Sequence, residues 1–167
     1  MGWLAKIFGA VKKEELVGAH FNYMQPHWEV DGPKDFPSLF RALDGWLSEQ
    51  CILYFEGGSP DSEINNFMKA NSIPEQTHIE MGTIWPRPKM FHVPGTHAIL
   101  KALAEIMEHH AEPELAVHFH VYRQGVVLLE WHDAFSQPML ITSDISEDNV
   151  RKLADRMGTK YKRIVEQ

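Results

Sequence analysis

Hydrophobic and polar residues follow two different periods along the chain, and these periods predict where helices and strands lie. Apolar residues recur at helical spacing in five segments, of which four, at 39–47, 60–73, 97–112 and 147–157, follow a residue type that caps helix N-termini. The predicted caps are Ser38, Ser59, Thr96 and Ser146, and Gly158 is the predicted stop of the last helix.

The fifth helical stripe lies at residues 1–14 and contains the apolar residues Trp3, Leu4, Ile7 and Phe8. We predict an N-terminal amphipathic helix that acts as an arm or docking helix. It can dock on its own domain, pair with a second subunit or lie on a membrane surface. Most such stripes are buried in protein, and this one is too short for strong interfacial binding, so peripheral membrane contact is disfavoured.

Six further segments have the composition or alternation of β-strands, whereas residues 18–36 mix aromatics with Pro and Gly and are predicted to form an irregular loop. Strands that follow one another through short turns pair antiparallel. We therefore predict an α+β fold in which residues 15–167 form a single domain, with helices packed on one face of a mainly antiparallel sheet of about six strands. The predicted strands are 51–56, 77–85, 90–93, 116–122, 126–132 and 139–142.

The hairpin at residues 116–133 is the segment richest in candidate chemistry. The sequence YRQGV is typical of a three-residue loop with Gly125 at the left-handed position, which would pair His118 with Glu130. This register leaves one strand face wholly apolar. It gathers the polar residues on the other face, together with Tyr122, Val126 and Leu128; these polar residues are His118, His120, Glu130 and His132.

Two interpretations of this polar face compete. His118, His120 and His132 can supply three nitrogens to a zinc ion, with Glu130 as a further ligand or a base. A His-x-His pair on a strand is a common pattern, however, and a solvated sheet face without any cofactor is favoured. We therefore predict no cofactor, with zinc as the alternative.

Composition narrows the class of protein. No apolar run reaches the ~18–20 residues that cross a bilayer, so no transmembrane segment is expected. The single cysteine, Cys51, and the lack of a secretory signal pattern favour a cytoplasmic location. The net charge of −7 argues against nucleic acid as a partner. The charge is also segregated, because residues 150–165 hold six basic side chains and one acid, a net +5 against −12 elsewhere.

These features predict a small protein-binding or self-associating module without catalysis, and a homodimer in particular. The candidate interaction residues are the four apolar residues of the N-terminal stripe, together with Trp85 and Arg87 in the proline-stiffened segment WPRPK. The alternative is a zinc-dependent hydrolase that uses the histidine-rich sheet face.

Overall fold

The computed structural model describes residues 19–46, 50–79 and 88–165, and these form one α+β domain. The predicted fold class is confirmed, although the sheet has seven strands and not six, all paired antiparallel in the order β3-β2-β4-β5-β6-β1-β7. The strands are β1 His27–Val30, β2 Ile52–Gly57, β3 Met90–Pro94, β4 Ala116–Arg123, β5 Val126–Trp131, β6 Met139–Thr142 and β7 Tyr161–Ile164. The helices are α1 Phe36–Leu43, α2 Ser62–Asn71, α3 His97–Met107, α4 Glu112–Leu115 and α5 Glu147–Met157.

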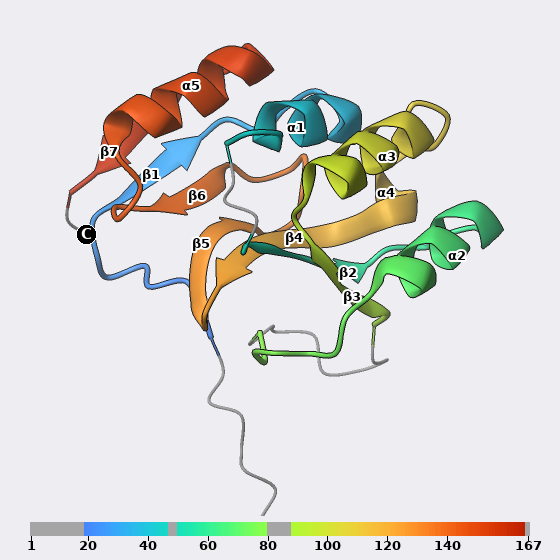
Figure 1. Ribbon diagram of the computed structural model, residues 1–167. Coiled ribbons are helices and arrows are strands. Elements are labelled where there is room, and N and C mark those ends of the chain that lie inside the picture. Colours follow the sequence, from blue (N-terminus) through green and yellow to red (C-terminus); the bar gives the residue numbers. More distant parts are fainter. Residues whose placement is uncertain (1–18, 47–49, 80–87, 166–167) are drawn as a thin grey trace, which may run out of the picture.

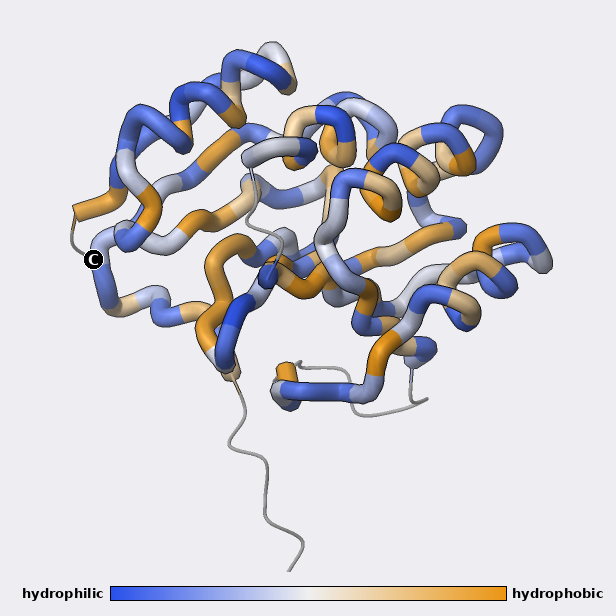
Figure 2. Tube along the Cα trace, viewed as in Figure 1, coloured by the Kyte–Doolittle hydropathy of each residue, from blue (hydrophilic) through white to orange (hydrophobic). Residues whose placement is uncertain are grey.

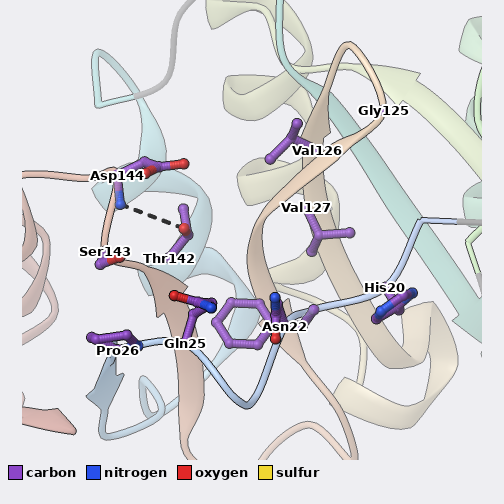
Figure 3. A pocket seen from close by; sticks show the side chains of 11 residues that line it. His20, Asn22, Gln25, Pro26, Gly125, Val126, Val127, Thr142, Ser143 and Asp144 are labelled. Atoms are coloured by element: carbon purple, nitrogen blue, oxygen red, sulfur yellow. Dashed lines mark hydrogen bonds between the residues drawn. The ribbon is translucent and has the colours of Figure 1, made fainter. Parts of the chain in front are cut away.

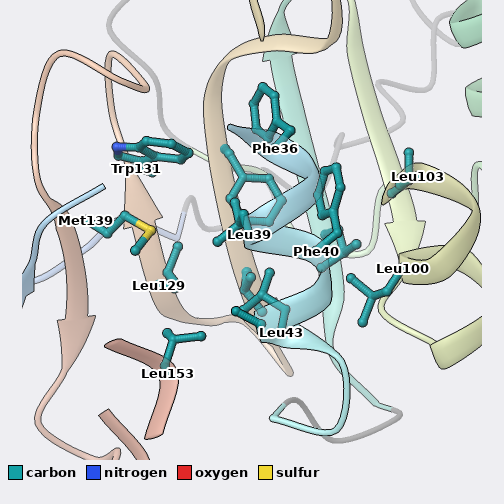
Figure 4. Close-up of a cluster of buried hydrophobic side chains, with 14 of the residues drawn as sticks. Phe36, Leu39, Phe40, Leu43, Leu100, Leu103, Leu129, Trp131, Met139 and Leu153 are labelled. Carbon is teal, nitrogen blue, oxygen red and sulfur yellow. The ribbon is translucent and has the colours of Figure 1, made fainter. Parts of the chain in front are cut away.

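The helices lie on one face of the sheet, with α1 between α3 and α5 (Figure 1). Their apolar stripes meet the strands in a single core, and the hydrophobic stretches of the chain accordingly lie between the two layers (Figure 2). Figure 4 shows side chains of α1, among them Phe36, Leu39 and Phe40, beside Trp131 and Leu129 of β5. All five of these residues are buried.

Local capping signals predicted some helix starts correctly and others not. Thr96 and Ser146 accept the backbone N–H groups of Ile99 and Asn149, so the predicted caps of α3 and α5 are confirmed. Gly158 ends α5 in the left-handed conformation, also as predicted. The caps predicted for the two earlier helices were wrong. Aspartates a few residues away take both places, Asp35 for α1 and Asp61 for α2.

Two strands were missed, and most of one predicted strand, at 77–85, lies outside the described residues. β1 lies inside the segment expected to be loop and pairs with both β6 and β7, while β7 lies in the basic segment 150–165, where no strand was predicted. Within the described part of the expected strand at 77–85, only Ile79 makes a strand-like bridge, a parallel one to Ala19.

Residues 1–14, Trp85 and Arg87 lie outside the described residues, so the expectations for them stay predictions. None of the helices that the structure describes combines the length and the hydropathy needed to span a lipid bilayer.

Candidate functional site

The β4–β5 hairpin closes with a tighter turn than predicted. Arg123 pairs with Val126, and the two residues between them, Gln124 and Gly125, have φ values of 50° and 79°, as in a two-residue type I′ turn. A β-bulge then restores the side-chain alternation, because Tyr122 pairs with Val127 whereas Val121 pairs with Leu129. The extra residue, Leu128, packs in the helix-side core, whereas it was predicted on the polar face. Val127 lies on the opposite side of the sheet from the helices, whereas it was predicted on the apolar face.

The bulge also changes which polar residues meet. Glu130 pairs with His120 and not with His118 as predicted. Apart from Val127 and Leu128, the apolar and polar faces from Phe119 to Trp131 are nevertheless separated as expected, because the bulge compensates for the shorter turn.

The polar face is not a solvated surface, which corrects the prediction of a wet face. His118 and Glu130 are each 7% exposed, His120 is 1% exposed, and His92 of β3 is 7% exposed. Of the predicted candidates only His132 reaches the solvent, with half of its side chain exposed.

Two segments, residues 19–23 and 73–79, cover this face, and we call them the strap. They join each other through the amide of Ala19, which donates to the carbonyl of His78. Figure 1 shows both on the side of the sheet opposite the helices. Phe21 and Ile79 of the strap pack with Tyr54 and Tyr122 in a second, smaller hydrophobic cluster.

Under the strap, four residues form a line of direct cross-strand partners. His92 of β3 lies opposite Tyr54 of β2, which lies opposite His120 of β4, which in turn lies opposite Glu130 of β5. Tyr54 and Tyr122 are hydrogen-bond partners of two buried polar side chains, Glu56 and His92. The Tyr54 hydroxyl donates to Glu56 Oε2 at 2.6 Å, and the Tyr122 hydroxyl lies 2.9 Å from His92 Nδ1. Burial raises the pKa of Tyr122 to about 12, so its hydroxyl stays protonated at neutral pH.

Glu130 is the buried carboxylate at the open end of this line. Tyr23, from the strap, donates its hydroxyl to Oε1, and His120 Nε2 lies 3.4 Å from Oε2. Burial raises the pKa of Glu130, but these two neighbours outweigh it and hold the pKa below its ordinary value. Neither ring nitrogen of His120 makes a hydrogen bond within the described structure, so His120 approaches Glu130 without one.

His118, His132 and Asp133 form a second group at the end of the hairpin. The two imidazole rings stack with centroids 4.2 Å apart and planes 13° apart. The Asp133 amide donates to His118 Nδ1 at 3.0 Å, so this nitrogen carries no proton in the neutral ring. The Asp133 carboxylate lies 3.7 Å from His118 Nδ1 and 3.7 Å from His132 Nε2, beyond hydrogen-bond distance of both. One ligand atom from each residue lies within 4.8 Å of the others.

The loop that carries this group is strained. Asp133 and Phe135 adopt left-handed backbone conformations, with φ values of 47° and 69°, which for a bulky aromatic residue is an outlier. Backbone bonds hold the loop in place, because the Ala134 amide donates to Val117 and the Gln137 amide donates to Asp133. The strain therefore fixes where His132 and Asp133 stand relative to β4.

A pocket of about 320 Å³ opens beside both groups. It gathers side chains from the strap, β1, β5, the strained loop and β6. Its wall is rich in acids, which favours a cation over an anionic ligand. The lining residues are Tyr23, Glu29, Glu130, His132, Asp133, Gln137, Pro138 and Leu140.

A different pocket, of about 400 Å³, lies between the strap, the β4–β5 turn and the end of β6 (Figure 3). Its only titratable lining residues are His20 and Asp144, which stand on opposite sides in Figure 3. A pocket with two separated titratable groups gives no constellation for catalysis.

The four predicted site residues therefore divide into two pairs, His120 with Glu130 and His118 with His132. Sequence reasoning missed Asp133 and Tyr23. Asp133 directly follows His132 and could have been found as a local ligand, whereas Tyr23 is more than a hundred positions away from Glu130 and gave no such signal.

Comparisons of the chain with protein-family models, with curated proteins and with solved structures found no match in any of the three.

Proposed function

We propose that this chain acts by self-association, as a module that pairs with a second copy through the surface around Phe135. The supporting observation is a patch that carries an exposed aromatic side chain beside an apolar hollow of about 520 Å³. Phe135 and Val117 are 36% and 37% exposed, and both line this hollow. The other lining residues are Lys34, Glu112, Pro113, Ala116, Ala134 and Ser136.

The backbone strain at Phe135 supports a role for its exposed ring. A left-handed conformation costs a non-glycine residue about 1–3 kcal/mol, and such residues cluster at functional sites. One side of the ring packs at 4.5 Å from Trp131 and 5.1 Å from Phe36, measured between centroids. The strain thus holds an aromatic ring half in the core and half at the surface, which is typical of an interface anchor.

The patch is also self-complementary, which favours a second copy as the partner. In a two-fold interface residue i of one copy meets residue j of the other and vice versa. Phe135 is a projection next to a hollow, so two copies can each insert it into the other. Lys34 and Glu112 line the same hollow with opposite charges, and the two-fold relation brings each opposite the other across the interface.

The basic segment 150–165 does not support self-association in the same way. All six of its basic side chains are exposed, but five already contact groups of their own chain. Arg151 and Lys152 pair with Asp148, Arg156 donates to the carbonyls of Ala42 and Asp44, Lys162 pairs with Glu29, and Arg163 lies over Trp28.

The test is light scattering of Ser136→Arg, which places a charged side chain in the hollow without removing a core contact. We expect the unaltered chain to run as a dimer of the 19.2 kDa chain at micromolar concentration, and Ser136→Arg to run as a monomer. Ser143→Arg, the same change in the pocket of Figure 3, is the matched control and keeps the dimer. A monomer for the unaltered chain, or a dimer that survives Ser136→Arg, would contradict the proposal.

A second candidate function is metal-dependent hydrolysis in the pocket beside Glu130. The observation that favours it is the grouping of His118, His132 and Asp133, of which His132 and Asp133 line the pocket. A metal-bound water there would have an ionised carboxylate, Glu130, on the same wall to accept its proton.

A further inference from the structure

We infer that His118, His132 and Asp133 form a binding site for one divalent transition-metal ion, with zinc as the best match. This ligand set differs from the one predicted from sequence, because His120 and Glu130 are replaced by Asp133. The inference is independent of self-association, since none of the three residues lines the hollow beside Phe135.

The spacing of the three groups fits a shared ion better than it fits direct bonds between them. Two ligands at about 2.0–2.1 Å from a tetrahedral zinc ion lie about 3.3 Å apart. The Asp133 carboxylate lies 3.7 Å from a nitrogen of each histidine. These separations are too long for hydrogen bonds, and the three ligand atoms, all within 4.8 Å of one another, must move closer together to reach ligand distance.

Two features of the fold hold the ligands together before an ion arrives. His118 is fixed within β4, with its side chain 9% exposed, and His132 stacks on it. Asp133 is fixed by the loop bonds that run to Val117 and Gln137. One bond must be given up, because the lone pair of His118 Nδ1 that an ion would take accepts the Asp133 amide.

The site is open on one side, which distinguishes it from a closed structural zinc site. The side chains of His132 and Asp133 are 50% and 51% exposed, and both line the pocket that Glu130 also lines. Three protein ligands and one open position are the arrangement of catalytic zinc sites. Two imidazoles and one carboxylate favour zinc and its neighbours over magnesium or calcium, which prefer all-oxygen ligands.

The experiment is a titration of metal-free protein with Zn²⁺ by calorimetry and with Co²⁺ by visible absorption. We expect one ion per chain and intense Co²⁺ bands of low coordination number. His132→Gln and Asp133→Asn should weaken binding more than about 100-fold, above the ~10–100-fold that outer-shell residues contribute. Both residues are half exposed, and asparagine tolerates the left-handed backbone, so both variants should fold.

His109→Gln is the matched control, since His109 is an exposed histidine outside the group, and it should bind like the unaltered chain. Equal affinity of the unaltered chain and the His132→Gln and Asp133→Asn variants would overturn the inference, as would the absence of a stoichiometric ion. Ser136→Arg is expected to bind the ion normally, so a failed dimer and a failed metal site give different results.

Discussion

The two faces of the sheet are covered in different ways, and their interiors differ accordingly. Helices cover one face, and the buried cluster beneath them contains only hydrophobic residues. The strap covers the other face, and beneath it and beside it lie the buried polar residues His27, Glu56, His92, His118, His120 and Glu130. An amphipathic helix brings a continuous apolar stripe, whereas the short strap contributes only a few apolar side chains such as Phe21 and Ile79.

The comparison teaches that burial alone does not decide whether a sheet position must be apolar. A buried polar group is tolerated where a partner satisfies it, and on the strap side tyrosine hydroxyls serve Glu56, His92 and Glu130. On the helix side, the indole N–H groups of Trp28 and Trp131 donate to backbone carbonyls, and the core around them is apolar. Mutations on the helix side should therefore destabilise the fold mainly through lost packing. Mutations on the strap side should destabilise it mainly through lost partners of buried polar groups.

The largest expected effect is on the helix side. Leu129→Ala removes a fully buried side chain and leaves a cavity, which should lower the free energy of unfolding by about 2–5 kcal/mol. Urea denaturation measures this, with the m-value checked for constancy. Val126→Ala, at an exposed position of the same strand, is the control and should change stability by at most ~0.5 kcal/mol. A cost for Leu129→Ala as small as that of the control would mean that the helix layer does not pack as described.

An intermediate effect is expected on the strap side, from the buried pair His120 and Glu130. His120→Leu leaves the Glu130 carboxylate buried with Tyr23 as its remaining neighbour, which should cost about 1–3 kcal/mol. The double replacement His120→Leu and Glu130→Leu removes the stranded charge as well, so it should cost less than His120→Leu alone. A double-mutant cycle by urea denaturation measures the coupling. Simple additivity of the two single effects would show that the pair does not interact.

The smallest effect concerns pH and again separates the two faces. Burial lowers the pKa of His92 and His118 from 6.5, so below about pH 6.5 the unfolded chain binds protons that the folded chain does not. The free energy of unfolding should therefore fall as the pH drops below 6.5, while these groups leave it unchanged above that pH. Unfolding curves in chelating buffer at several pH values measure the slope.

His110, outside the strap side, provides the control for this pH effect. Its hydrogen bond to the Ile106 carbonyl raises its pKa, so it contributes stability at low pH that is lost as the pH rises through its folded pKa. His110→Gln should accordingly change the pH dependence only above pH 6.5, where His110 loses its stabilising contribution, whereas His92→Gln should flatten the fall below pH 6.5. A flattened fall below pH 6.5 in His110→Gln, with none in His92→Gln, would contradict the assignment of this pH effect to the buried rings.

The sequence predicted those parts of the fold whose signals are local. Thr96, Ser146 and Gly158 mark the ends of α3 and α5 within a few residues of the helices themselves. β1 was missed because its four residues lie between Pro26 and Gly32. Its pairing partners, β6 and β7, come more than a hundred residues later in the sequence. Likewise, nothing local in the sequence YKRI predicts β7. Its side chains Lys162 and Arg163 contact Glu29 and Trp28, which are distant in the sequence.

The candidate site shows the same limit. The alternation of residues along the hairpin predicted which polar side chains share a face. It did not predict that they are buried, because the strap that covers them comes from two distant segments whose docking no local pattern specifies. The pairing within the set depended on the bulge at Leu128, which exchanged the partner of Glu130. Asp133 joins the group because the loop backbone is left-handed at this residue. Nothing in the sequence HDAF predicts that conformation.

The position of β1 in the sheet has a consequence for how the chain is made. Of the described strands, β1 is the first to be synthesised, yet both of its neighbours, β6 and β7, belong to the last third of the sequence. Until residues 139–164 have left the ribosome, β1 has neither partner, whereas β2, β3, β4 and β5 can already pair among themselves. Loop closure over such a separation is slow. The nascent protein therefore holds a partial sheet that ends at β5, and its native edge is completed only when β6 and β7 have emerged.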